Sequence, residues 1–311
     1  MASAGIDVSE CRLPAVRGHE HGDRTVNRSG DTRRCLICGG STLRPVFIEQ
    51  GIEILRCRTC GHVSSSYEGD PHYDGFWGET VADADHVYWN RARARMHQDF
   101  FDRFVAGRSG RLLDMGCGLG FFLKRLSGYQ GWEACGCEIS AAAVRYARET
   151  LGLENVMCAR LEEATWPRAS FNLITLWDVI DHVARPDALL KHCHDLLAAK
   201  GLCFIRTPNI SMHLPRARLK ALLWGDRRDT TYLQPRDHLH HYSSVAIQTL
   251  LERNGFSRVQ VLHLHAIDSP SSKHRTISRA ARSLWFHASR GVDRLSRGHI
   301  NIDNLYVIAQ V

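Results

Sequence analysis

A glycine-rich turn between an apolar strand and the start of a helix is the first segment of the chain that could do chemistry. It reads LLDMGCGLGFFL over residues 112–123. Glycines allow a ligand to approach the backbone closely, and the start of a helix offers N–H groups that lack intrahelical partners. The spacing is G-x-G-x-G, with Phe121 where a dinucleotide fingerprint has its last glycine. Asp114 therefore lies where a carboxylate could meet a cationic amine rather than a pyrophosphate.

Glu138 is a second candidate ligand. It follows the next apolar stretch, 132–137, and lies 22 residues after Gly116. A carboxylate at the tip of this strand can accept hydrogen bonds from both hydroxyls of a ribose. Ser140 opens the next helix, so Glu138 can also be read as part of an exposed helix N-terminus. The glycine-rich turn upstream favours the ribose role.

Polar residues also follow the predicted strand at 171–177. Asp178, Asp181 and His182 lie just beyond its carboxyl end, the edge of an open α/β sheet where ligands collect. An imidazole titrates close to working pH, so His182 could take a proton from an acceptor hydroxyl. A structural histidine that fixes the loop before Pro186 is the alternative.

A histidine-rich segment, DHLHHY, occupies residues 237–242 before a predicted helix. Three histidines near carboxylates could indicate a catalytic metal. Because His240 and His241 are adjacent, however, we expect them to face different ways. We interpret His238 instead as a catalytic residue on the substrate side, or as one that fixes the loop.

Four cysteines form two matched pairs near the N-terminus. Cys35 and Cys38 are separated from Cys57 and Cys60 by 18 residues, the spacing of a structural zinc site. Glycines follow both pairs, where tight turns around a tetrahedral ion need them. Four thiolates close the coordination sphere, so the ion is predicted to fold a small segment and not to activate water. A redox dithiol is disfavoured because two pairs occur without a βαβ unit around them.

The elements that must position these residues alternate along the chain as βα units, which predicts an α/β fold with a mostly parallel sheet. A helix is expected at 87–106 and short strands at 43–48 and 52–56. Candidate strands of the main sheet lie at 111–115, 132–137, 155–158, 171–177, 201–206, 256–263 and 303–310, and candidate helices at 119–128, 140–151, 186–198 and 243–254.

Composition limits the setting. The 311 residues carry a formal charge of +7 with 33 acidic residues among 40 basic ones, which permits an anionic partner without requiring nucleic acid. Residues 1–32 have few large apolar side chains and are predicted to be a disordered tail. There is no signal-peptide pattern and no apolar run of about 18 residues, so we expect a cytoplasmic protein without a transmembrane segment.

The runs LLDMGCGLGFFL, CEIS, SFNLITLWDVIDHVARPDALL and DHLHHYSSVAIQTLLERNGF, in this order, resemble the class I S-adenosylmethionine-dependent methyltransferases that carry an N-terminal zinc ribbon. The resemblance covers about residues 33–265. It implies a Rossmann-like methyltransferase fold: a seven-stranded, mostly parallel sheet with helices on both faces, plus the small ribbon. It also divides the chain into a ribbon at 33–66, a linker and helix at 67–106 and a methyltransferase domain at 107–311.

The resemblance implies roles for individual residues. The acid at the glycine turn and the glycines contact the methionine and ribose parts of S-adenosylmethionine, Glu138 binds the ribose and Ile139 covers the adenine. Arg160 stands where relatives often have an aspartate, so the adenine contact is expected from Leu161 or Glu162. The predicted cofactor-binding residues are Asp114, Gly116, Cys117, Gly118, Gly120, Glu138, Ile139, Leu161, Glu162, Trp177 and Asp178.

We therefore expect methyl transfer from S-adenosylmethionine to a small molecule, with O-methylation of a sugar or natural-product intermediate ahead of C- or N-methylation. Basic insertions at 208–236 and 269–300, the second an amphipathic helix, would shape the acceptor pocket, and the acceptor could be anionic or carrier-linked. RNA methylation through the ribbon is the rival, although the ribbon has few aromatic residues for stacking. A non-catalytic partner-binding module is the third reading. The sequence predicts no oligomeric state.

Overall fold

The computed structural model describes residues 34–69, 77, 82, 85–225, 232–268, 284–285, 287–292, 294–295, 301 and 303–311. The tail predicted at 1–32 lies outside the described residues. So does most of the second insertion, whose described residues 284–285, 287–292 and 294–295 are helical.

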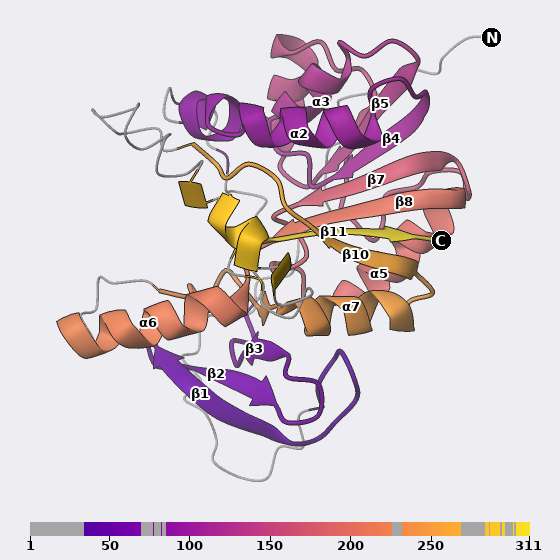
Figure 1. Cartoon of the computed structure of the whole chain (residues 1–311). Helices are drawn as coiled ribbons and strands as arrows, with labels where there is room; N and C mark the ends of the chain where they lie inside the picture. The colour runs from indigo at the N-terminus through magenta and orange to yellow at the C-terminus, as the bar shows by residue number, and fades with distance from the viewer. Residues whose placement is uncertain are drawn as a thin grey trace.

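A seven-stranded sheet forms the centre of the molecule (Figure 1). Its order is β10-β11-β8-β7-β4-β5-β6, and the five strands from β8 to β6 pair in parallel while β10 and β11 are antiparallel. The mostly parallel sheet predicted from the sequence is confirmed. The strands are β4 (Gly110–Met115), β5 (Trp132–Glu138), β6 (Val156–Cys158), β7 (Phe171–Trp177), β8 (Leu197–Thr207), β10 (Ser257–Leu262) and β11 (Leu305–Gln310).

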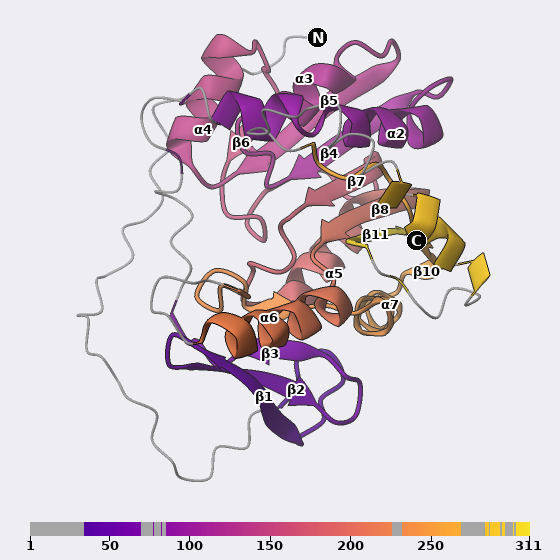
Figure 2. The same ribbon diagram turned by 60° about the vertical axis from the view of Figure 1, so that its left-hand side comes forward.

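Helices cover both faces of this sheet, and each face has its own apolar core (Figure 2). On one face, α2, α3 and α4 contribute Phe100, Phe122 and Val144. On the other, α5 and α7 contribute Leu190 and Ile247. The helices are α2 (Ala94–Phe104), α3 (Phe121–Leu126), α4 (Ala141–Arg145), α5 (Pro186–Leu196) and α7 (Ser244–Arg253). The helices predicted at 87–106 and 140–151 each include a π-helical stretch, η2 (His86–Arg91) and η3 (Tyr146–Thr150).

A second, four-stranded sheet lies below the seven-stranded sheet in the view of Figure 1. It joins the ribbon to the rest of the chain. Its order is β1-β2-β3-β9. The first three strands, β1 (Leu43–Glu49), β2 (Ile52–Cys57) and β3 (Val63–Ser65), belong to the ribbon, but β9 (His240–His241) comes from the histidine-rich segment. The predicted division at residue 66 therefore does not separate two sheets, because β9, from far beyond that division, completes the ribbon sheet.

The first basic insertion contains a helix that the sequence analysis did not predict, α6 (Ile210–Trp224). Asn209 caps its start, since the side-chain oxygen accepts the Ser211 N–H at 3.0 Å. Ile210 and Leu214 pack with Ile54 and Val63 of the ribbon sheet, and Figure 1 shows the helix lying along that sheet. The helix therefore buries one side of the ribbon.

Candidate active site

The glycine-rich turn has the backbone shape that its sequence predicts. Gly116 and Gly118 have φ values of +74° and +52°, which side-chain-bearing residues rarely adopt. A Cβ atom at Gly116 would lie 2.6 Å from Cγ2 of Val179, and one at Gly118 would lie 3.3 Å from the indole of Trp77. The turn therefore has no room for a side chain at Gly116, and at Gly118 a side chain would be in tight contact with Trp77.

Glu138 is held at the tip of β5 directly beside this turn. Its Oε2 accepts the Gly118 N–H at 2.9 Å and its Oε1 accepts the Ser140 N–H at 2.9 Å. The side chain is buried, and this burial raises its pKa. Each carboxylate oxygen has a second lone pair, so both can still accept a hydroxyl group. This geometry suits a ligand with two neighbouring hydroxyls.

Asp114 lies at the end of β4, under the same turn. It is 2% exposed and accepts a hydrogen bond from Thr175 Oγ1 at 2.7 Å. Burial, with a smaller contribution from the charge of Glu138, raises the pKa of Asp114 to about 8. A buried carboxylate of this kind favours a cationic ligand, because a neighbouring positive charge stabilises its ionised form.

The remaining predicted cofactor residues differ in their surroundings. Cys117 is buried in the turn, Ile139 and Leu161 are half-buried and Glu162 is exposed. The indole of Trp177 packs in the core, 4.6 Å from the ring of Phe204 and 5.2 Å from that of Phe122. Any contact of Trp177 with a cofactor would therefore come from its backbone.

Asp178 is the centre of a buried ionic cluster. It has a left-handed φ of +56° and forms ion pairs with Arg93, at 2.8 Å, and with Arg206. Arg93 also lies 4.2 Å from the ring of Trp89. Burial lowers the pKa of both arginines. Two guanidinium groups around one carboxylate leave an excess of positive charge near the end of β7.

Neither of these two arginines is among the site residues predicted from the sequence. Arg206 was visible only as the last residue of a predicted strand, and Arg93 as one of several arginines in a predicted helix. The position of Arg206 at the carboxyl end of that strand was the only signal that could have found it.

The two predicted catalytic histidines meet next to Asp181. The Nε2 atoms of His182 and His238 lie 3.6 Å and 3.9 Å from Asp181 Oδ2, and the two ring centroids are 4.6 Å apart. Burial lowers the pKa of His238 and lowers that of the neighbouring His241 to about 3. The structure thus brings together two histidines that are far apart in the sequence, with both imidazoles beside a buried carboxylate.

Contacts from the ribbon hold the segment that carries His238. Glu49 at the end of β1 is buried and accepts three backbone N–H groups, those of Tyr232 (3.0 Å), Leu233 (2.8 Å) and Gln234 (3.0 Å). The Ser65 hydroxyl donates to the Pro235 carbonyl at 2.6 Å. With the pairing of β3 and β9, these bonds fix the segment on both sides of His238.

The four predicted zinc ligands form one cluster. Their sulfur atoms all lie within 4.8 Å of one another, with 3.6 Å between Cys35 and Cys60 and between Cys38 and Cys57. Burial raises the pKa of Cys57, but backbone N–H groups outweigh this effect and lower it to about 7. Gly39 and Gly61 have φ values of +75° and +74° in the two turns. This donor set fits a tetrahedral zinc ion.

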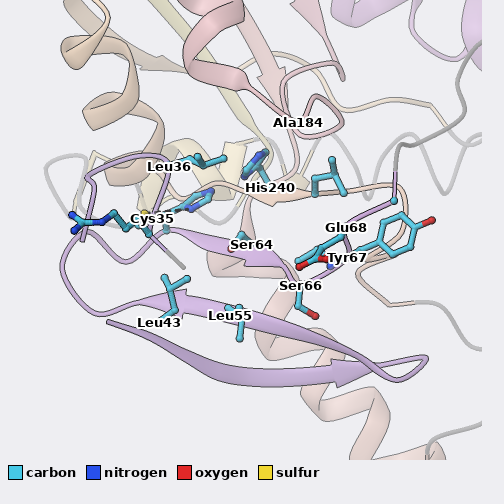
Figure 3. Close-up of a pocket in the computed structure, with 15 residues that line it drawn as sticks. Cys35, Leu36, Leu43, Leu55, Ser64, Ser66, Tyr67, Glu68, Ala184 and His240 are labelled. Atoms are coloured by element: carbon cyan, nitrogen blue, oxygen red, sulfur yellow. Dashed lines mark hydrogen bonds between the residues drawn. The ribbon is translucent and has the colours of Figure 1, made fainter. Parts of the chain in front are cut away.

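A cavity of about 430 Å³ lies where the ribbon meets the domain (Figure 3). The residues that line it come from the ribbon, from residues 67–69 directly after it, and from Ala184, Leu239 and His240. The glycine-rich turn, His182 and His238 do not line it. The cavity is therefore separate from the glycine-rich turn and from the two predicted catalytic histidines, although the predicted zinc ligand Cys35 lines it.

The fold and the site define a Rossmann-like methyltransferase. The methyltransferase domain family matches residues 88–261, more than half of the 311 residues, and the chain belongs to this family.

Among curated proteins, the chain is similar to the ubiquinone biosynthesis O-methyltransferase of Parvibaculum lavamentivorans, with 36% identity over 103 residues that cover 32% of this chain and 40% of that protein. It is also similar to the enzyme of the same name from Neisseria meningitidis serogroup C, with 28% identity over 117 residues. These residues cover 36% of this chain and 49% of that protein. The chain thus spans less than half the length of these two relatives.

Among solved structures, the chain is similar to phosphoethanolamine N-methyltransferase 2 of Haemonchus contortus in complex with S-adenosyl-L-methionine. The TM-score is 0.50 at 14% identity, and the match covers 80% of this chain and 62% of that one. At this identity the likeness supports the fold alone.

Proposed function

We propose that this protein transfers a methyl group from S-adenosylmethionine to a small molecule. The observation that carries the proposal is the joint placement of Glu138 and Asp114 at the glycine-rich turn, where one carboxylate is held by two backbone N–H groups and keeps spare lone pairs, and the other favours a cation. A ribose with two hydroxyls and a positively charged methionine moiety combine these features. The names of the curated relatives agree with a small-molecule acceptor.

The chain's own residues would act mainly by positioning. The bound cofactor supplies an already activated methyl group, so holding the acceptor in line with it provides much of the rate. Glu138 would bind the ribose, and Asp114 and the glycines would bind the methionine side of the cofactor. The adenine would be bound by Ile139, Leu161 and Glu162. The excess positive charge of Arg93 and Arg206 around Asp178 suits the carboxylate of the methionine moiety.

The acceptor is proposed to approach from the side of His182 and His238. These imidazoles are partly exposed, 19% and 22%, beside a buried carboxylate. Such groups can activate a hydroxyl. O-methylation of a metabolite such as a sugar or a natural-product intermediate therefore remains our preferred reaction, ahead of transfer to carbon or nitrogen.

The zinc ribbon is proposed to be structural and not to bind RNA. Of the aromatic residues in or next to the ribbon, Phe47 packs edge-on against Tyr232 with ring centroids 6.2 Å apart, and Arg236 lies 5.4 Å from the ring centroid of Tyr67. Both rings thus already have contacts within the chain, which does not favour stacking on bases.

The proposed setting is the cytoplasm, because clustered cysteines suit metal binding in a reducing compartment. Among the described residues, the helices are too short or too polar to cross a bilayer.

Calorimetry with S-adenosylmethionine tests the proposal. We expect micromolar-range binding by wild type and none by Gly118→Arg, whose side chain would meet Trp77. Binding by the variant equal to that of wild type would reject the site. If S-adenosylmethionine binds but loses no methyl group to any of a broad panel of hydroxylated acceptors, the hypothesis of a non-catalytic binding module would be favoured. Retention on RNA that falls steeply with salt would favour the RNA reading.

A further inference from the structure

Asp181 is a buried carboxylate that lacks a hydrogen bond. The residue is 2% exposed, and within the described part of the chain neither Oδ1 nor Oδ2 has a hydrogen-bond partner. An ionised carboxylate away from water is costly unless a cation or several donors compensate for its charge. A positive charge bound next to Asp181 would therefore stabilise its ionised carboxylate.

Two imidazole nitrogens face this carboxylate across a small gap. His182 Nε2 is 3.6 Å and His238 Nε2 is 3.9 Å from Asp181 Oδ2, and the three ligand atoms all lie within 4.8 Å of one another. These separations are too long for hydrogen bonds. They suit an ion placed between the three atoms, because metal bonds to imidazole nitrogen and carboxylate oxygen are about 2.0–2.2 Å long.

Contacts with neighbouring backbone groups help to position two of these three residues, His182 and Asp181. His182 Nδ1 lies 2.9 Å from the Asp237 carbonyl oxygen, so it donates its proton there and the lone pair belongs to Nε2. The Asp181 carbonyl accepts the His240 N–H at 3.1 Å, which ties the loop after β7 to β9. Hydrogen bonds that fix the tautomer of a histidine in this way are typical of metal ligands.

We propose that Asp181, His182 and His238 bind one divalent transition-metal ion, at a site distinct from the four cysteines. Two imidazoles and one carboxylate suit first-row metals such as Fe²⁺, Co²⁺ or Zn²⁺. Three protein ligands leave coordination positions open, unlike the closed four-thiolate site. The site thus has the features of a catalytic metal centre.

Its role in the reaction, which rests on the proposed methyl transfer, would be to bind the acceptor hydroxyl. Coordination lowers the pKa of a hydroxyl, so its proton passes to solvent and the oxygen stays bound as an anion. The oxygen then forms a bond to the methyl carbon while the carbon–sulfur bond of the cofactor breaks. The electron pair of the broken bond remains on sulfur. The acceptor would accordingly be an alcohol or a phenol.

Cobalt(II) provides the test. Full-length protein with zinc in the ribbon is titrated with Co²⁺ and followed by absorption in the visible range and by calorimetry. We expect one Co²⁺ per chain with weak d–d bands and without the thiolate charge-transfer band that cobalt in the ribbon would give. Asp181→Asn and His238→Gln should each weaken binding about tenfold or more.

Two controls keep the result specific. His192→Gln removes a histidine of α5 that contacts the Ala164 carbonyl, and it should bind Co²⁺ like wild type. If Asp181→Asn fails to fold, His182→Gln at the partly exposed ligand replaces it. Equal Co²⁺ affinity of wild type and ligand variants, or no binding at all, would overturn the metal site. Calorimetry with S-adenosylmethionine reports separately on the proposed function, which this outcome leaves intact.

Discussion

The N–H of Gly118 donates to Oε2 of Glu138 at 2.9 Å. This bond joins the turn after β4 to the tip of β5. The two parts of the predicted nucleoside site, the glycine-rich turn and the Glu138 carboxylate, are therefore fixed relative to each other. The carboxylate is thus oriented by the backbone that the ligand would contact.

Replacing Glu138 should remove this orientation. We expect Glu138→Ala to weaken S-adenosylmethionine binding by tenfold or more in calorimetry, because both ribose hydroxyls lose their acceptor. Glu133→Ala is the matched control, since Glu133 lies on the same strand but pairs with Arg111 at 2.8 Å. Similar affinities of the two variants would argue against the ribose role.

Asp114 should link stability to pH. Its pKa is about 8 in the folded chain against 3.8 ordinarily. Since the folded pKa is raised, the stabilising effect of the protonated form is complete below about pH 4 and is lost as the pH rises to about 8. We expect Asp114→Asn to be more stable than wild type at pH 9 by about 1–3 kcal/mol.

The same variant should bind S-adenosylmethionine more weakly, because the cationic ligand loses its counter-charge. Thermal melts at pH 5 and pH 9 and calorimetry at pH 9 measure both effects. A stability difference that does not grow with pH would contradict the assignment.

Cys57→Ser should abolish zinc binding by the four-cysteine cluster and destabilise the chain. Cys57 is 1% exposed and belongs to the same apolar core as Ile37 and Tyr242, so the loss should extend beyond the ribbon and exceed about 3 kcal/mol. Metal analysis and urea unfolding provide the measurement. Cys203→Ser, at a buried thiol outside the cluster, should keep the zinc content of wild type. A zinc content of Cys57→Ser equal to that of wild type would exclude the ribbon site.

Glu49→Gln should loosen the segment that carries His238. An amide can accept only through its one oxygen, so at least one of the three N–H bonds to residues 232–234 is lost. We expect hydrogen exchange over 232–242 to rise several-fold, with S-adenosylmethionine affinity unchanged. Glu53→Gln on β2 is the control, and unchanged exchange in Glu49→Gln would show that the carboxylate does not hold the segment.

Much of the fold could be predicted because its signals are local. The strands of the main sheet are apolar runs bounded by turns, and the glycine-rich turn and cysteine pairs are fixed by spacing alone. The same locality placed Asp114, Gly118 and Glu138 at one edge, since the carboxyl ends of parallel strands meet there.

The rest depends on contacts between distant segments. β9 has only two residues and exists because Val63 and Ser64 pair with His241 and His240. α6 escaped prediction because Pro215 lies inside it and because its Leu219, Leu222 and Leu223 are exposed. The approach of His238 to Asp181 likewise follows from the pairing of the ribbon with the domain, which has no signature in either segment.

The shared ribbon sheet also restricts how such proteins can be recombined. A chimaera that exchanged residues 34–66 for the corresponding part of another enzyme would give β9 a foreign neighbour and leave residues 232–234 without their Glu49 acceptor. A chimaera that folds would need residues 232–242 from the same donor enzyme as residues 34–66. The two stretches should therefore be inherited and engineered together, although about 170 residues of sequence separate them.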